Sequence, residues 1–243
     1  MKYVKQCKGQ DISSKNFKAG YYWVSPKLDG FYTQIHYKDG DLKVYLSSGK
    51  ELANPIVDKL KYFLSGSNFA DFVVEAELIY KSGDLGSREV VNNLIKGNSK
   101  EPLELFSFRI FYVLSGYILV NSDIIKNMSE HKMYFSSIED VEKHYYQYGY
   151  KKGEDEGLML RALNFKYKEG KRVNTLLKYK PLFLATLKVA SKRADGYLSL
   201  VDTNGITAKV KISPSMLDYI GNEVTISYER IVNSYVCARY YKN

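Results

Sequence analysis

Cysteine and histidine are scarce in this chain of 243 residues. Its two cysteines, Cys7 and Cys237, stand near opposite ends of the sequence, and only three histidines occur. No zinc-binding spacing can be assembled from them. The scarcity of cysteine predicts a reducing cytoplasm, in which any bound metal would have oxygen ligands.

Long apolar runs are missing as well. No run of about 18 apolar residues occurs, which excludes a membrane-spanning helix. Residues 1–11, MKYVKQCKGQD, contain no apolar segment of the kind that directs export, so we expect a cytoplasmic protein with no membrane partner. The apolar fraction of 45% supports a folded core, and the length suits one large domain, or a larger domain with a small module.

Acidic residues are outnumbered by basic ones. Lysine and arginine total 36 against 27 aspartates and glutamates, which gives a net charge of +9. This excess predicts a polyanionic partner. It does not decide between a nucleic acid and a membrane surface.

The stretch YYWVSPKLDG places Lys27 at the end of an aromatic and apolar run that is typical of a buried strand. Pro26 has no backbone N–H to donate, so we expect the strand to end there and to present Lys27 at its rim. Gly30 allows a tight turn or a close approach to a ligand. A turn after a strand is the ordinary interpretation of such a motif, and a reactive lysine requires partners elsewhere in the chain.

The downstream pattern predicts a domain of strands and helices. Strands are expected over residues 31–38, 42–46, 72–80, 105–114, 158–162 and 175–180, and helices over 54–66, 87–97, 123–133 and 138–148. Asp39-Gly40 predicts a two-residue hairpin turn. Glu75 and Glu77 share one face of their strand, and that face either meets solvent or lines a site.

From residue 182 onward the pattern contains only short strands, expected over 184–190, 196–202, 206–212, 223–229 and 234–241. Such a series predicts a small barrel. We therefore expect an α+β fold with mixed or antiparallel sheets over residues 1–181. A small all-β barrel should follow over 182–243.

Five segments occur in an order and spacing that together resemble a known family: SPKLDG, VEAEL, FRIFYVL, EGLMLR and LLKYKP, followed by the short barrel. They resemble the covalent nucleotidyltransferases, and most closely the ATP-dependent DNA ligases. The resemblance covers nearly the whole chain, although residues 115–150 contribute little to it. It implies an adenylation domain followed by an OB-fold domain.

Chemistry and resemblance together assign roles. A lysine amine is a poor nucleophile while protonated, and neighbouring cations favour its reactive form. The expected catalytic residues are Lys27, Asp29, Lys178 and Lys180. The expected nucleotide contacts are Ser25, Lys27, Leu28, Glu77, Phe111, Lys178 and Lys180, with Phe111 stacked on adenine. The expected metal ligands are Glu77 and Glu156, and the expected DNA contacts are Lys50, Arg161 and Arg193.

The resemblance implies three steps. ATP adenylates Lys27 with Mg²⁺ or Mn²⁺ as cofactor, AMP passes to the 5′-phosphate of a nick, and the adjacent 3′-hydroxyl seals the strand. The expected partner is nicked duplex DNA, held largely through its phosphates, and we expect a monomer. Minimal ligases of this length belong to viruses, phages and some bacteria, so the cytoplasm would be that of a bacterial or infected host cell.

The sequence also departs from the family pattern. Tyr32 and Ser48 stand where ligases usually carry arginines that handle the nick phosphate or AMP, with Lys50 as a candidate substitute. Tyr112 stands where an acid follows the aromatic of the middle motif. These departures leave two alternatives open beside the DNA ligase. One is an RNA ligase or a capping guanylyltransferase, and the other is a nucleic-acid-binding module without catalysis.

The C-terminal end bears on the first alternative. Capping enzymes carry a clear R-x-D-K pattern, which is matched here only loosely by Arg239-Tyr240-Tyr241-Lys242. Many RNA ligases lack a small barrel of this type. Both features favour DNA as the substrate.

Overall fold

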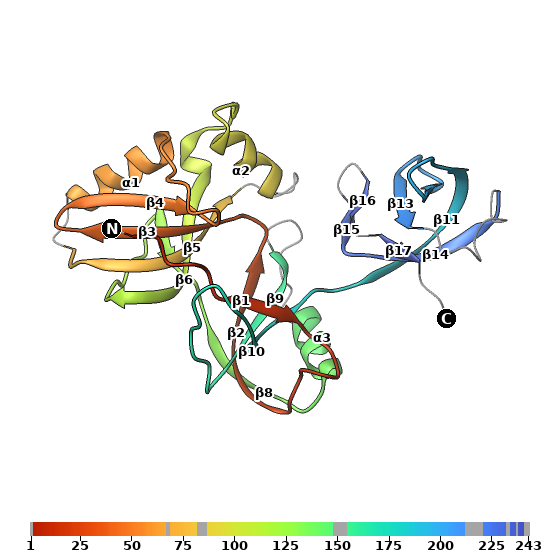
Figure 1. Cartoon of the computed structure of the whole chain (residues 1–243), viewed down its shortest axis with the longest axis horizontal. Helices are drawn as coiled ribbons and strands as arrows, with labels where there is room; N and C mark the ends of the chain where they lie inside the picture. The colour runs from red at the N-terminus through yellow and green to blue at the C-terminus, as the bar shows by residue number, and fades with distance from the viewer. Residues whose placement is uncertain are drawn as a thin grey trace. The chain divides into compact units, whose positions relative to one another are not determined.

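The computed structural model describes residues 2–66, 69–81, 87–147, 155–211, 221–231, 234–236 and 238–240. The chain divides into two units, Met1–Tyr179 and Lys180–Asn243 (Figure 1). Within the described residues, no helix has the length and apolar character needed to cross a membrane.

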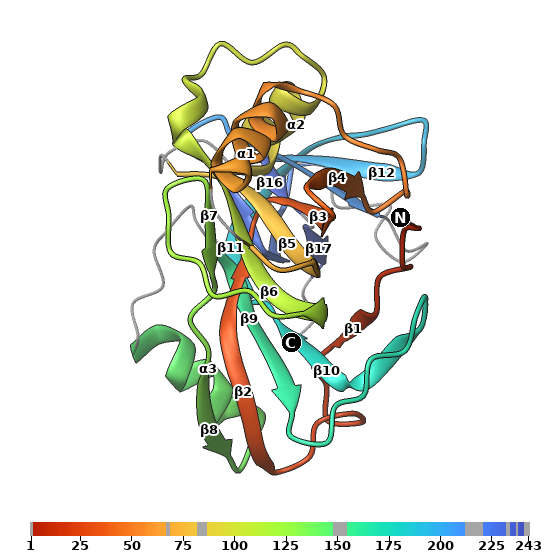
Figure 2. The same cartoon turned by 90° about the vertical axis from the view of Figure 1, so that its left-hand side faces the viewer.

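The first unit contains two five-stranded sheets, with strand orders β1-β10-β9-β2-β8 and β4-β3-β5-β6-β7 (Figure 2). The strands are β1 (Lys8–Asp11), β2 (Gly20–Leu28), β3 (Phe31–Lys38), β4 (Asp41–Leu46), β5 (Phe72–Tyr80), β6 (Phe106–Gly116), β7 (Ile125–Asn127), β8 (His131–Phe135), β9 (Asp155–Ala162) and β10 (Arg172–Tyr179). The helices are α1 (Pro55–Ser65), α2 (Ser87–Ile95) and α3 (Ile138–Gln147), with a 3-10 turn at Leu103–Leu105. Both sheets are mixed, because β1 pairs with β10 and β7 with β6 in parallel.

The hairpin β3–β4 and helix α1 form as their local signals predict. Asp39 and Gly40 both have positive φ, 51° and 78°, as a two-residue turn between twisted strands requires. Asn54 caps α1, because its side chain accepts a hydrogen bond from the N–H of Val57. Helix α1 buries Ile56 against the second sheet, and α1 and α2 lie on one side of that sheet (Figure 1).

Strand β2 does not end at Pro26, contrary to the expectation. It continues to Leu28 by pairing with β9, whereas its pairing with β8 stops at Val24. Pro26 therefore lies where β2 has a neighbour on one side only, a position that tolerates proline. Lys27 stands opposite Gly157 of β9, inside a paired strand.

The helix expected over residues 123–133 is wrong. This segment instead contains β7 and leads into β8, which pair with β6 and β2. Ile125 is fully buried opposite Phe108, so strand pairing determines the conformation of a segment whose own helical propensity is weak. The following helix is confirmed as α3, and β9 begins earlier than expected, at Asp155.

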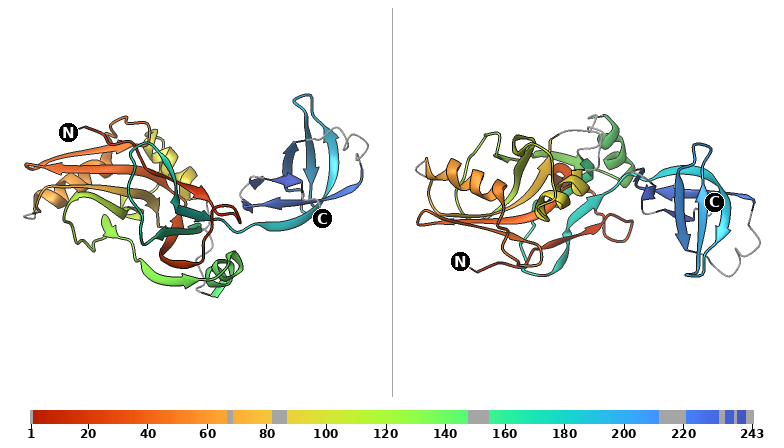
Figure 3. Two further views of the ribbon diagram at one scale, coloured as in Figure 1. Left: turned by 60° about the horizontal axis from the view of Figure 1, so that its bottom comes forward. Right: turned by 90° about the horizontal axis from the view of Figure 1, so that it is seen from above.

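In its described residues, 180–211, 221–231, 234–236 and 238–240, the second unit contains strands and no helix (Figure 3). Its strands are β11 (Phe183–Lys192), β12 (Tyr197–Val201), β13 (Thr207–Lys211), β14 (Glu223–Tyr228), β15 (Arg230–Ile231), β16 (Tyr235–Val236) and β17 (Arg239–Tyr240). Five of them form an antiparallel sheet in the order β13-β12-β11-β14-β17, around a core that includes Leu187, Leu200 and Ile226. In place of one strand over 234–241, the chain forms the short β16 and β17.

The α+β class is thus confirmed, with mixed sheets and few helices in the first unit and strands in the described part of the second. A bridge between Thr207 and Ser234 links the start of β13, at the edge of this sheet, to the segment before β16. The assignment of residues 1–181 and 182–243 to two named domains stays a prediction.

Candidate functional site

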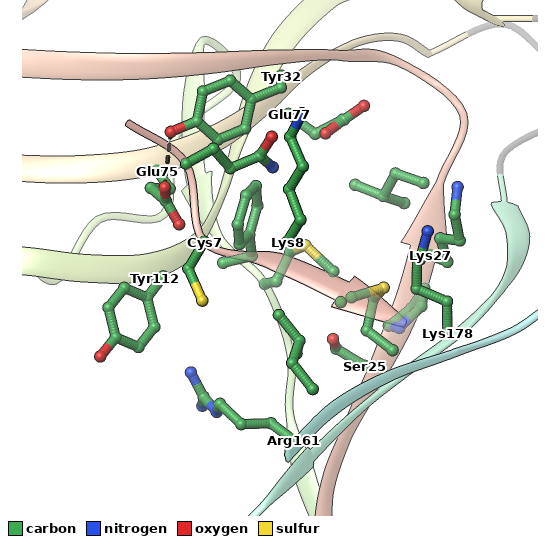
Figure 4. A pocket seen from close by; sticks show the side chains of 18 of the residues that line it. Cys7, Lys8, Ser25, Lys27, Tyr32, Glu75, Glu77, Tyr112, Arg161 and Lys178 are labelled. Carbon is green, nitrogen blue, oxygen red and sulfur yellow. Dashed lines mark hydrogen bonds between the residues drawn. The ribbon is translucent and has the colours of Figure 1, made fainter. Parts of the chain in front are cut away.

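A cavity of about 390 Å³ lies in the first unit and receives residues from both of its sheets (Figure 4). Strand β5 separates this cavity from the core. Val74, Ala76 and Leu78 are buried in the core with α1 and α2, whereas Glu75 and Glu77 line the cavity. Of the two interpretations left open for this acidic face, the site-lining one agrees with the structure.

Most of the expected site residues line this one cavity although they come from distant parts of the sequence. They are Ser25, Lys27, Leu28, Glu77, Phe111, Glu156, Arg161 and Lys178. Asp29 is buried beside them, with 3% of its surface exposed. In the view of Figure 4, Lys27 and Lys178 lie on one side of the cavity and Tyr112 and Arg161 on the other.

Besides Asp29, three expected site residues do not line the cavity. Lys180 follows the end of β10 at Tyr179, so it does not share a strand face with Lys178 as expected. It belongs to the second unit, where its Nζ lies 2.8 Å from Oε2 of Glu229. Arg193, in the same unit, is exposed near Asp195, and Lys50 is exposed in the loop after β4.

Lys27 is surrounded by opposite charge. Its ammonium group forms an ion pair with Glu156, and both side chains are largely shielded from solvent. This contact follows from the pairing of β2 with β9, which sets Lys27 opposite Gly157, the neighbour of Glu156. Lys178 lies 3.2 Å from Oδ1 of Asp11, at the next strand of the same sheet.

Glu77 is a carboxyl group in a low-dielectric setting. Burial raises its pKa to about 8, while the neighbouring cations Lys27 and Arg88 act in the opposite direction. Its charged form therefore depends on nearby positive charge. Arg88, near the start of α2, also lies over the ring of Phe31, and the sequence motifs gave no indication of it.

The donor set suits a hard divalent cation only in part. Among the described residues, no group of three His, Cys, Asp or Glu side chains is placed to hold a metal ion. Glu77 and Glu156 are close enough to influence each other's charge, and two carboxylates are what a Mg²⁺ ion uses when substrate phosphates and waters complete its shell. The two residues therefore fit such an ion together with a phosphate ligand.

A second buried acid, Glu75, organises the opposite wall. It accepts hydrogen bonds from the hydroxyl groups of Tyr32 at 2.6 Å and Tyr167 at 2.7 Å. Burial raises the pKa of Glu75, and these two hydrogen bonds lower it. Tyr32, which stands where ligases usually carry an arginine, thus points its hydroxyl group into a buried hydrogen-bond network.

The N-terminal segment completes this wall. Gln34 accepts a hydrogen bond from the N–H of Val4 at 2.9 Å and donates one to its carbonyl group at 3.0 Å. Cys7 and Lys8 follow in the chain and line the cavity. Sequence motifs did not indicate them, because β1 reaches the site only by pairing with β10, far along the chain.

Arg161 and Tyr112 form part of the same wall. Arg161 makes an ion pair with Glu130 and lies over the ring of Tyr112, 5.5 Å from its centre. Tyr112 also stacks on Tyr167, with ring centres 5.3 Å apart. Arg161, expected as a DNA contact, is therefore placed in the cavity wall.

Comparisons with known proteins give a fold. No protein-family model matches the sequence, and no curated protein sequence is similar to it. Solved structures of ATP-dependent DNA ligases do match over nearly the full chain. The chain therefore has the fold of these ligases, which confirms the resemblance of its motifs at the level of the fold.

Three of these structures illustrate the match. One comes from work on DNA binding by the minimal scaffold of Lig E DNA ligases, with 18% identity, a TM-score of 0.71 and coverage of 99% of both chains. The Chlorella virus DNA ligase-adenylate is 14% identical, with a TM-score of 0.53 and coverage of 99% of both chains. The bacteriophage T7 ligase in complex with ATP is 15% identical, with a TM-score of 0.52 and coverage of 98% of both chains.

Proposed function

We propose that this chain is an ATP-dependent DNA ligase that seals nicks in duplex DNA through a lysyl-AMP intermediate. The observation that supports this most is the cavity that holds Lys27 with Glu156, Glu77 and Lys178 on a ligase fold. Two similar structures are a ligase-adenylate and a ligase with ATP, which supports ATP as the nucleotide. Residues 1–181 would be the adenylation domain and 182–243 the OB-fold domain.

In the first step the amine of Lys27 attacks the α-phosphorus of ATP. A nitrogen–phosphorus bond forms, the bond between the α-phosphorus and the bridging oxygen breaks, and pyrophosphate leaves with that oxygen. The ammonium proton must first leave to water, and the positive charges of Lys178 and of a bound divalent cation would favour the neutral amine. Lys178 would stabilise the charge that develops on the phosphate oxygens.

Glu77 and Glu156 are the residues that would hold Mg²⁺, which when bound would neutralise phosphate charge. Ser25 and Leu28 line the nucleotide cavity, and Phe111 offers a ring for stacking against adenine. Lys180 remains an expected contact of the nucleotide.

The two later steps transfer and release AMP. A 5′-phosphate oxygen of the nick attacks the lysyl-AMP phosphorus, the nitrogen–phosphorus bond breaks, and Lys27 recovers its amine. The 3′-hydroxyl then attacks the 5′-phosphorus and AMP leaves, with Asp29 as a helper in this chemistry. Lys50 and Arg193, both exposed, remain the expected contacts with nicked duplex DNA, and the enzyme would act as a monomer.

Labelling tests this proposal. The protein is incubated with Mg²⁺ and α-labelled ATP or GTP, and nicked DNA or nicked RNA duplexes are then added. Label from ATP should appear on the protein, be lost in Lys27→Ala and persist in Lys38→Ala, a control at the exposed end of β3. Nicked DNA should be sealed.

Other outcomes contradict the proposal. If neither ATP nor GTP labels the protein, both a ligase and a capping guanylyltransferase are excluded. Label from GTP alone would indicate a capping guanylyltransferase, and sealing of nicked RNA without sealing of nicked DNA would indicate an RNA ligase.

A further inference from the structure

The connection between β9 and β10 carries a dense set of basic side chains. Lys166, Lys168 and Lys171 lie in it, and Arg172 begins β10; all four are exposed. They line a hollow of about 480 Å³ on the first unit. No carboxylate occurs among the described residues that line this hollow.

Aromatic residues anchor this connection to the cavity wall. Phe165 and Tyr167 both contact Tyr112, one edge-on with ring centres 5.7 Å apart and the other stacked. The hydroxyl group of Tyr167 also donates to Glu75. Because anchors and lysines alternate, Lys166 and Lys168 are held exposed at the surface next to each anchor.

The N-terminal segment provides a second anchor. The N–H of Gly170 donates to the carbonyl group of Lys5 at 3.0 Å, and the N–H of Lys5 donates to Oε1 of Glu169 at 3.1 Å. Glu169, the one acid of the connection, therefore accepts a hydrogen bond from the backbone. The cations sit on a backbone fixed at both sides, which lowers the ordering cost of binding an anion.

The hollow adjoins the candidate active site through a shared residue. Arg172 lines both the hollow and the nucleotide cavity, and its guanidinium group donates to the carbonyl group of Gly9 at 2.8 Å. An anion that occupies the hollow can therefore be continuous with one that occupies the cavity. This arrangement suits a polyanion longer than a nucleotide.

Neutral donors in the same hollow favour a phosphate backbone. Gln10, Asn164, Asn174 and Thr175 line it beside the cations. Amide and hydroxyl side chains contact phosphate and sugar oxygens of duplex nucleic acids alongside lysine and arginine. A hollow of this composition recognises charge and backbone shape without reading base sequence.

We propose that this hollow binds the phosphate backbone of the duplex next to the nick. The inference rests on the proposed function. The hollow would provide phosphate contacts that two other residues cannot make. Tyr32 donates its hydroxyl hydrogen to the buried Glu75, and Ser48 carries no charge.

The test removes three of the charges together, in Lys166→Ala, Lys168→Ala and Lys171→Ala. Binding of a fluorescent nicked DNA duplex is measured by anisotropy over a range of salt concentrations, and adenylation by labelled ATP is measured separately. We expect weaker binding and a plot of log affinity against log salt that is shallower by about 0.9 for each lost phosphate contact. Adenylation should be unchanged, because none of the three lysines lines the nucleotide cavity.

A matched triple variant controls for net charge. Lys59→Ala, Lys61→Ala and Lys96→Ala remove the same charge from exposed positions that line neither the hollow nor the cavity. An equal loss of binding in this variant would overturn the inference. So would an unchanged salt slope in the first variant, or a raised ATP requirement without a loss of duplex binding. If the unaltered protein is not adenylated but the salt slopes still differ as expected, the proposed function fails and the hollow stands.

Discussion

At position 32 a neutral tyrosine stands where the resemblance to ligases predicts a charged arginine. The resemblance to ligases places an arginine at this position, whereas Tyr32 is buried and donates its hydroxyl hydrogen to Glu75. Burial, together with the charge of Glu75, raises the pKa of Tyr32, so the hydroxyl stays protonated and remains a donor. Tyr32 therefore supports a wall of the cavity through its hydrogen bond to Glu75.

Tyr32→Phe should therefore destabilise the protein. The change leaves Glu75 buried with one of its two tyrosine hydrogen bonds, and losing a hydrogen bond to a charged group costs about 1.5–3 kcal/mol. Urea denaturation measures the free energy of unfolding. Tyr62→Phe, on an 83% exposed side chain of α1, should change it by less than about 0.5 kcal/mol. Equal effects in the two variants would show that the Glu75 network does not contribute.

Residues of the candidate site could be predicted from the sequence where their neighbours in the chain are unusual for that residue type. Lys27 beside a proline and a glycine, and Glu77 on an apolar strand, are unusual enough to notice without coordinates. Lys8 and Tyr167 are ordinary residues in their local sequence. They line the site only because strands distant in sequence pair or dock there.

The same distinction applies to secondary-structure elements. The β3–β4 hairpin and α1 follow from a turn dipeptide and a cap, which act within a few residues. Strands β7 and β8 follow from partners on β6 and β2, so the helix expected there was wrong. Pairing between distant strands is not encoded in a local pattern.

Gly30, in the turn between β2 and β3, is an element-scale constraint that the sequence did indicate. A Cβ atom there would lie 2.3 Å from the carbonyl oxygen of Leu78 and 2.8 Å from Cγ of Glu77. The close approach of this turn to β5 sets the distance between Lys27 and Glu77.

Gly30→Ala should destabilise the fold by about 1–3 kcal/mol, as overpacking does, because backbone must shift. Adenylation should fall as well, since the shift separates β2 from β5. Gly66→Ala is the matched control, because its Cβ would meet no atom closer than 3.8 Å. Thermal unfolding and labelled ATP uptake measure the two effects, and a Gly30 variant as stable and active as the Gly66 variant would contradict the constraint.

At the scale of the whole molecule, the contribution of histidine to acid sensitivity lies in one unit. The three histidines of the chain all lie in the first unit. Burial lowers the pKa of His36 to about 4 and also lowers that of His144, whose ring nitrogen lies 3.0 Å from that of His131. In the unfolded chain these groups titrate near about 6.5, so the unfolded state binds more protons below that pH.

His36 and His144 should therefore favour folding less as the pH falls from about 6.5 toward 4, whereas Glu77, whose pKa burial raises to about 8, should act in the opposite direction. Urea denaturation at neutral pH and at mildly acidic pH, followed by the fluorescence of the single tryptophan Trp23 in β2, reports on this unit. When the pH falls between the two conditions, His36→Gln should lose less stability, or gain more, than the unaltered protein. An equal pH dependence in this variant would show that His36 does not contribute.

Tyr167 belongs to the cavity through Glu75 and to the basic connection through its place between Lys166 and Lys168. The two regions are consequently not independent of each other. A chimaera that exchanges residues 163–171 for the corresponding connection of a DNA ligase with this fold would also remove the hydrogen bond to Glu75, and would alter the cavity without changing the sequence motifs that line it. Under the proposed function, evolution toward a different nucleic acid is thereby tied to compensating changes in the cavity wall.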